Sequence, residues 1–215
     1  MTITTAVLGG ARRVERDDVV SLAGVLARAF HEDPVGEWLF PDATGRQRGL
    51  TRLFESEIQH VTLPHGEGLT NRDETGAALW LPPGHWKVPP LTLTRLLPRF
   101  MGLFGRRLPL ILRGLFEVEK HHPSSDDHFY LPFIGVEPDH QGLGIGSSLL
   151  KPILKRCDAS RVGAYLEATC DANCRLYERH GFMVVREIQL PDGPPVWPMW
   201  RSPSHYPLAA SDGVN

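Results

Sequence analysis

Apolar residues recur at helical spacing near the start of the chain. The positions between 22 and 29 form one face of a helix that we expect to begin at the N-cap Asp17 and to stop at Pro34. The same pattern predicts the other elements of this half: a strand over 12–16, a helix over 44–60, strands over 68–72 and 77–81, and helices between 89 and 121.

The second half alternates more regularly between strand-like and helical spacing. The apolar run 129–136 predicts a buried strand, and 147–160 predicts a helix that Pro152 should kink, because proline removes one backbone hydrogen bond. Further elements are expected: a strand over 164–168, a helix over 173–180 closed by Gly181, and strands over 182–189 and 196–201, with Met183 and Met199 in the core. We therefore predict one α/β domain over 1–203 with a mixed, mostly antiparallel sheet, and a flexible tail over 204–215.

Composition and charge narrow the classes of function. The net charge is −2 with an isoelectric point near 6.5, so no global positive field favours nucleic acid. The most apolar stretch, 91–116, is interrupted by arginines and prolines, which favours soluble helices over a membrane span; an interfacial helix is the alternative. An odd number of cysteines and no signal-peptide pattern at the start lead us to expect reduced thiols and a cytoplasmic location.

A glycine-rich loop lies between the strand 129–136 and the helix that follows. Gly142, Gly144 and Gly146 can adopt positive φ and let a ligand approach the backbone, and the amides of the next helix point into this turn. No lysine precedes Ser147, as a P-loop requires, and the spacing is not that of a dinucleotide fingerprint. The pattern favours a pyrophosphate site, with a turn that binds no ligand as the alternative.

The motif Gln141-x-x-Gly144-x-Gly146 resembles the acyl-CoA signature of the GCN5-related N-acetyltransferase (GNAT) superfamily. Asn173 and the segments 165–169 and 176–182 strengthen the resemblance, which extends over about 121–203 and is thin before it. Within the superfamily the chain is most similar to the puromycin N-acetyltransferase type. The resemblance implies a twisted sheet of about seven strands flanked by helices, with acetyl-CoA as the acetyl donor and no metal.

The resemblance also implies roles for individual residues. The strand before the loop would accommodate the pantetheine arm, and the loop amides would hold the pyrophosphate. Asn173 would lie near the pantetheine and Tyr177 near the thioester sulfur, since residues four apart share one face of a helix. The cofactor-binding residues implied are Ile134, Gly135, Val136, Gln141, Gly142, Leu143, Gly144, Ile145, Gly146, Ser147, Asn173 and Tyr177.

Acetyl transfer to an amine needs a proton donor for the departing thiolate and a proton acceptor for the amine. Tyr177 suits the first role, because a phenol with a pKa near 10 stays protonated at neutral pH. Glu167 is our first candidate for the second, although a structurally paired glutamate is an equal alternative. Other candidate bases are His128, Tyr130, Glu32 and Asp33. The acids Glu32, Asp33, Glu37 and Asp42 form either a solvated loop or a wall that attracts a cationic amine.

The expected activity is transfer of an acetyl group from acetyl-CoA to a primary amine of a small molecule, antibiotic-like or metabolic, by direct attack in a ternary complex. We expect a monomer or homodimer that binds neither nucleic acid nor membrane. No metal site is expected, since His121 and His122 are adjacent and Cys170 and Cys174 lack a second pair. The alternatives are a protein N-terminus or lysine as acceptor, and a non-catalytic acyl-CoA-binding module.

Overall fold

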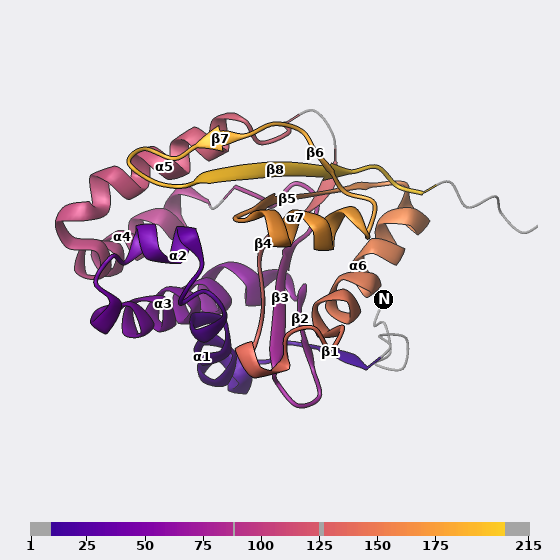
Figure 1. The fold of residues 1–215 in the computed structure, drawn as a ribbon, viewed down its shortest axis with the longest axis horizontal. Helices are drawn as coiled ribbons and strands as arrows, with labels where there is room; N and C mark the ends of the chain where they lie inside the picture. The colour runs from indigo at the N-terminus through magenta and orange to yellow at the C-terminus, as the bar shows by residue number, and fades with distance from the viewer. Residues whose placement is uncertain (1–9, 88, 125–126, 205–215) are drawn as a thin grey trace, which may run out of the picture.

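A mixed eight-stranded sheet forms the centre of the computed structural model, which describes residues 10–87, 89–124 and 127–204. The strand order is β1-β2-β3-β4-β5-β8-β6, with β7 paired to β8 (Figure 1). The pair β4–β5 is parallel and the other pairs are antiparallel. The mixed, mostly antiparallel sheet is therefore confirmed, while the expected tail from 205 onward lies outside the described residues.

The elements follow the predicted order closely. The strands are β1 (Ala11–Arg13), β2 (Gly68–Asn71), β3 (Gly76–Leu81), β4 (His128–Val136), β5 (Gly163–Ala168), β6 (Met183–Val184), β7 (Ile188–Gln189) and β8 (Pro195–Arg201). The α-helices are α1 (Val19–Ala29), α2 (Pro34–Leu39), α3 (Ala43–Glu57), α4 (Pro90–Phe104), α5 (Leu108–Lys120), α6 (Ile145–Ser160) and α7 (Asp171–Glu178). None of the helices in the described ranges is long and apolar enough to cross a membrane.

Two predictions about helix ends are wrong. Asp18, rather than Asp17, is the N-cap residue of α1. Its carboxylate accepts the amide of Glu15 at 2.8 Å, within a short 3-10 turn that precedes the helix. Pro34 does not stop a helix but begins α2, a position that suits a residue without an amide hydrogen. Asp33 is the N-cap of that helix and accepts the amides two and three residues ahead.

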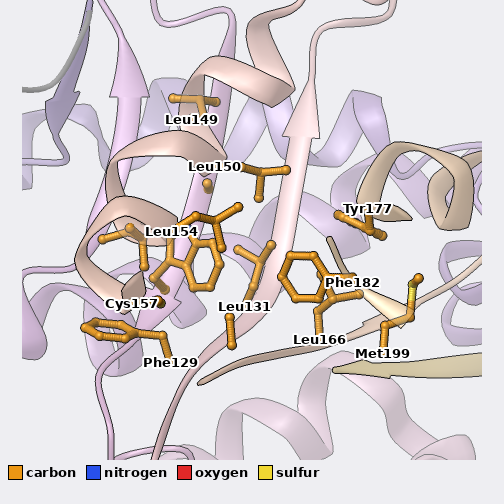
Figure 2. Packing of buried hydrophobic residues seen from close by; sticks show 14 of the residues in the cluster. Phe129, Leu131, Leu149, Leu150, Leu154, Cys157, Leu166, Tyr177, Phe182 and Met199 are labelled. Carbon is orange, nitrogen blue, oxygen red and sulfur yellow. The ribbon is translucent and has the colours of Figure 1, made fainter. Parts of the chain in front are cut away.

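The described residues bury apolar side chains in three clusters. One lies between α6 and the sheet, where Leu149, Leu150 and Leu154 point towards Leu131 and Leu166 (Figure 2). A second joins α1 and α3 to the opposite face of the sheet. A third lies where α2, α4 and α5 meet β7 and β8, at one end of the molecule (Figure 1). Helices therefore cover both faces of the sheet, as the apolar periodicity predicts.

Strand β4 changes face at a bulge. Phe129 and Leu131 pack in the α6 cluster, but so does Ile134, which is an odd number of residues further on. The register against β3 shifts over the same stretch, which includes Pro132. Proline has no amide hydrogen for the ladder, so a bulge is its natural place inside a sheet. The bulge leaves Phe133 in the cluster beside α1 and α3.

The predicted strand 182–189 is interrupted. It forms β6 and β7, which are two residues each and are separated by residues 185–187. Met183 was expected in the core, but 66% of its surface is exposed, whereas Met199 is fully buried. The expectation for Met183 is therefore wrong, because β6 lies at the edge of the sheet.

Candidate active site

The parallel strands β4 and β5 separate halfway along their length. Their pairing runs from His128 opposite Gly163 to Leu131 opposite Leu166 and ends there. Beyond this point β4 remains paired to β3 through Val136, but its other edge has no strand beside it. The parting follows directly after the bulge at Pro132. This geometry leaves backbone groups of 134–136 facing an opening in the middle of the sheet.

The glycine loop closes one end of this opening. Gly142 and Gly144 have φ values of 76° and 81°, which side chains rarely adopt, and a Cβ at either would meet no protein atom within 4 Å. Helix α6 begins after Gly144 without a side-chain cap, so the amides of its first turn are left for another partner. The Gln141 side chain anchors the loop by donating to the Val136 carbonyl at 3.2 Å. The loop is therefore an open cradle of backbone donors at a helix N-terminus, which suits phosphate oxygens.

A cleft of about 320 Å³, here called the loop cleft, joins this cradle to the gap between the strands. Its lining includes the predicted cofactor-binding residues Ile134, Gly135, Val136, Gln141, Gly142, Gly144, Ile145, Gly146, Ser147, Asn173 and Tyr177. Leu143 is the exception: 71% of its surface is exposed, and it does not line the cleft. His140 and Arg179 also line the cleft and could contact an anion. The spacing had not suggested these two.

Helix α7 carries Asn173 and Tyr177 to the cleft. Gly181 ends this region with a φ of 85°, and the amides of Gly181 and Phe182 return to the carbonyls of Glu178 and Tyr177. Phe182 then packs against the Tyr177 ring at 5.9 Å between centroids, as Figure 2 shows. The ring is thereby held in one orientation from two sides of the α7 turn.

Tyr177 is deeply buried, with 6% of its surface exposed. Burial raises the pKa of its phenol well above the ordinary value, and the negative charge of Asp33 adds to the effect. The phenol is consequently protonated throughout the physiological range. It is also a weaker acid than a solvated tyrosine, which limits how readily it gives up the proton.

Two further cavities continue from the loop cleft. A junction cavity of about 170 Å³ shares Phe30, Ile134, Asn173 and Tyr177 with the loop cleft. An apolar cavity of about 550 Å³, bounded largely by α3, α4 and α5, follows it. The junction and apolar cavities share Tyr130, Pro132, Phe133 and Glu167 among their lining residues. Tyr177 and Glu167 therefore both line the junction cavity.

Glu167 lies in β5 on the face opposite Leu166, as strand alternation predicts, and its side chain is 11% exposed. Its Oε2 accepts the hydroxyl of Tyr130 at 2.9 Å, while Oε1 is buried and has no hydrogen-bond partner among the described residues. His122 Nδ1 lies 3.8 Å from Oε1. A buried acceptor atom of this kind is costly unless a ligand or water satisfies it.

His122 was missed as a candidate because it lies outside the strand–loop–helix motif. The structure buries it between the Trp86 ring, which stacks on it at 3.8 Å, and Glu167. Its Nε2 is 2.9 Å from Nε2 of His128, so one ring donates and the other accepts. Glu57, at the end of α3, was missed for the same reason: it lines the apolar cavity, and burial raises its pKa to about 7.

The other candidate bases are already committed to different contacts. Tyr130 donates its proton to Glu167, and burial together with the charge of Glu167 raises the pKa of its phenol far above the ordinary value. His128 lies behind His122. Asp33 caps α2 and also accepts the Thr169 hydroxyl, with its pKa raised by burial. Glu32 is exposed.

The acidic residues of the first half have structural partners. Asp42 caps α3 by accepting two amides, and Glu37 pairs with Arg46 at 3.0 Å. Glu37 and Asp42 do not line the loop cleft or the junction and apolar cavities. No group of three metal-ligating side chains that could hold an ion occurs within 10–87, 89–124 and 127–204.

Comparison with known proteins identifies the family that this chain resembles. The model of the acetyltransferase (GNAT) family matches residues 113–182. An uncharacterized N-acetyltransferase of Schizosaccharomyces pombe is 31% identical over 193 residues, covering 84% of this chain and 76% of the relative. A crystal structure described as histone acetyltransferase HPA2 and related acetyltransferase, from Corynebacterium glutamicum, is 27% identical with a TM-score of 0.71, over 92% of this chain and 98% of that one.

More distant structures share the fold alone. A polyamine N-acetyltransferase of Drosophila melanogaster aligns with a TM-score of 0.59 over 89% of this chain and 98% of that one, at 16% identity. The splayed strands, the glycine cradle and the α7 tyrosine are thus found in a chain with extended similarity to N-acetyltransferases. On its identity and coverage with the Schizosaccharomyces pombe relative, the chain belongs to the GNAT family of acetyltransferases.

Proposed function

We propose that the protein transfers the acetyl group of acetyl-CoA to a primary amine of a small molecule, by direct attack within a ternary complex. The observation that carries this proposal is the continuity of the three cavities. The loop cleft leads through the junction cavity to a separate cavity of about 550 Å³, within the usual size range of small-molecule sites. Donor and acceptor can therefore approach from opposite sides and meet between Tyr177 and Glu167.

The residues of the loop cleft fit the donor. The amides of 142–147 would hold the pyrophosphate, and Arg179 could add a positive charge. The unpaired edge of β4 at 134–136 would hydrogen-bond the pantetheine amides, with Asn173 opposite. Acetyl-CoA supplies an activated thioester carbonyl. These contacts would place it at the junction cavity.

Two side chains would move the protons. Glu167 would accept a proton at its unpaired Oε1 from the bound ammonium, which leaves a neutral amine to attack the thioester carbonyl, and His122 lies 3.8 Å behind it as a further acceptor. Tyr177 donates its phenolic proton to the departing thiolate. The net reaction converts the amine and thioester to an amide and a free thiol, and releases one proton when the amine enters as an ammonium.

The proposal is tested by incubating the protein with acetyl-CoA and a panel of amines, and measuring free CoA. The panel contains alkylamines, arylalkylamines, polyamines, aminoglycosides, the aminonucleoside puromycin and a lysine-bearing peptide. The similarity to the puromycin N-acetyltransferase type is the reason for including the aminonucleoside. We expect amine-dependent CoA release with at least one small amine. Release with the peptide alone would contradict the small-molecule acceptor, and tight acetyl-CoA binding without release from any amine would indicate a binding module.

A further inference from the structure

Three acidic residues line the apolar cavity, namely Glu57, Glu119 and Glu167. The negative charges of Glu57 and Glu167 raise the pKa of the Tyr130 phenol. Tyr130 lines the same cavity as both carboxylates and also borders the junction cavity. Among the described residues, no basic side chain forms an ion pair with Glu57. Lys87, the one lysine of the lining, is exposed and pairs with Glu119 at 3.5 Å.

The remaining walls of this cavity are mostly aliphatic and aromatic. They include Leu93, Leu96, Phe100, Ile111, Leu112 and Leu115 from α4 and α5. Leu93, Leu112 and Leu115 each leave close to half of their surface exposed although they line the cavity. A ligand with an apolar body would cover this surface and remove it from water, which favours binding.

The acidic groups and the apolar walls of the cavity together indicate the chemistry of its ligand. Building on the proposed function, we infer that the acceptor is a monoamine with a bulky apolar body, such as an arylalkyl or alkyl amine, and that Glu57 is a specificity-determining residue that draws its ammonium into the cavity. Polyamines and aminoglycosides are disfavoured, because their additional ammonium and hydroxyl groups would lose water against leucine and phenylalanine without gaining partners.

The first test is a series of unbranched alkylamines from propylamine to octylamine. Each added methylene should raise kcat/KM about fourfold, because burying one is worth about 0.8 kcal/mol. Spermidine and kanamycin should be at least about 100-fold poorer than octylamine. A series with no dependence on chain length, or turnover of spermidine or kanamycin at or above the octylamine rate, would overturn the inference.

The second test compares Glu57→Gln with Glu55→Gln. Glu55 lies in the same helix but lines a different groove, between α3 and α4. We expect Glu57→Gln to raise the KM for octylamine about tenfold or more and to leave kcat and the KM for acetyl-CoA nearly unchanged. Glu57→Asp should fall in between. Inhibition by octanol, which has the same body and no charge, should not change. Equal behaviour of Glu57→Gln and Glu55→Gln, or an equal loss of octanol inhibition, would contradict the role.

Failure of this inference is distinguishable from failure of the proposed function. Release of CoA with spermidine or kanamycin, but not with octylamine, overturns the apolar acceptor and retains the proposed small-molecule acetyltransferase. Absence of CoA release from every amine overturns both.

Discussion

Tyr177 lines both the loop cleft and the junction cavity, and burial raises the pKa of its phenol, which makes it a weak acid. Replacing it with phenylalanine removes the proposed proton donor and keeps the ring that packs on Phe182. We expect Tyr177→Phe to lower kcat by about 10- to 100-fold, at the low end of general acid catalysis because the phenol is hard to deprotonate. Steady-state CoA release measures this change.

Binding should be unaffected by that substitution. The dissociation constant for acetyl-CoA, measured by calorimetry, should stay within about twofold of the original value, since the backbone cradle is untouched. An unchanged kcat would show that Tyr177 has only a packing role, and a large loss of acetyl-CoA binding would show that it acts mainly in donor binding.

Glu57 should make stability depend on pH. Burial raises its folded pKa to about 7, above its ordinary value near 4.5, so the folded state binds more protons than the unfolded state between these values. Stability is therefore fully present below about pH 4.5 and falls as the pH rises to about 7, by about 3 kcal/mol in total. Urea unfolding of the original protein and Glu57→Gln at pH 5 and pH 8 measures the difference.

Glu57→Gln should lose this part of the dependence of stability on pH, while all other titrating groups contribute equally to both proteins. Glu57→Gln should therefore gain up to about 3 kcal/mol relative to the original protein on going from pH 5 to pH 8. Parallel stability profiles for the two proteins would contradict a buried, uncompensated carboxyl at this position.

At the scale of residues, local spacing found the donor side and missed most of the acceptor side. Gln141 and the three loop glycines occur within one continuous strand–loop–helix pattern, and the resemblance of the later segment 176–182 added Tyr177, so short-range sequence was enough to find them. His122 and Glu57 become chemically meaningful only through burial and through neighbours far away in the chain, such as Glu167 and Tyr130. Sequence spacing contains no information about such contacts.

The glycine loop is the element whose backbone shape matters most for the donor. Gly144 has a positive φ and open space where a Cβ would be, so alanine there would strain the loop and project into the cradle. We expect Gly144→Ala to weaken acetyl-CoA binding about 10- to 100-fold, the cost of disturbing one or more charge-assisted amide contacts.

Gly84 provides a matched control. It has a φ of 78° and equally open surroundings, but lies outside the loop cleft. Gly84→Ala should therefore lose similar stability in urea unfolding, about 1–2 kcal/mol, and bind acetyl-CoA normally. Equal loss of affinity in both variants would mean that backbone strain alone, and not the cradle, explains the effect.

Helix α6 contains an internal proline that folding tolerates without breaking the helix, which is continuous from Ile145 to Ser160. Pro152 leaves the carbonyl of Ser148 without its helical donor and crowds the preceding turn. Pro152→Ala should raise the free energy of unfolding by about 1–3 kcal/mol in urea titration. A loss of stability would indicate that the proline ring makes packing contacts worth more than the missing hydrogen bond.

At the scale of elements, periodicity located nearly every helix and strand. Two errors concern a helix end at a proline and a strand that the structure divides in two. Pro34 was taken as a helix stop, although proline is also favoured at the first position of a helix when a cap such as Asp33 precedes it. The strand 182–189 was predicted as one segment, because apolar alternation does not reveal that β6 and β7 pair separately with β8.

Trp38 joins distant parts of the whole molecule. Its indole donates to the carbonyl of Pro191 at 3.0 Å and lies against Gly114 of α5 and Gly193 before β8. A Cβ on Gly114 would lie 2.5 Å from the Trp38 ring. Trp38 thus takes part in the cluster that packs helices bounding the apolar cavity onto the C-terminal hairpin, together with Ile111 and Val196.

Adding a methyl group at Gly114, where α5 contacts Trp38, should disturb the packing of the helices around the apolar cavity. We expect Gly114→Ala to lower the free energy of unfolding by about 1–3 kcal/mol through overpacking, and to raise the KM of the amine more than that of acetyl-CoA. Gly102→Ala in α4 is the matched control, since a Cβ there meets no atom within 4 Å, and it should be neutral or stabilising. Urea titration and steady-state kinetics check both variants. Equal effects of Gly114→Ala and Gly102→Ala would contradict a special role of the contact between Gly114 and Trp38.

The whole architecture could be anticipated from sequence only in its second half. The resemblance extends over about 121–203, and there it implied the loop residues that line the cleft, although it did not give the order of the strands. The apolar cavity instead depends on how α3, α4 and α5 pack against one another, which is set by contacts such as that of Trp38 with Gly114. Amphipathic periodicity predicts that such helices exist, but not the volume that they enclose.

The parting of β4 from β5 has a consequence for how the protein behaves towards other chains. An unpaired strand edge on the outside of a protein invites edge-to-edge association, and proteins usually protect such edges. Here the unpaired stretch 134–136 lies inside the molecule, where Phe30 at the end of α1 and Leu176 of α7 share the lining of the same cleft. The fold can therefore offer backbone hydrogen bonds to a narrow ligand while denying them to a neighbouring polypeptide.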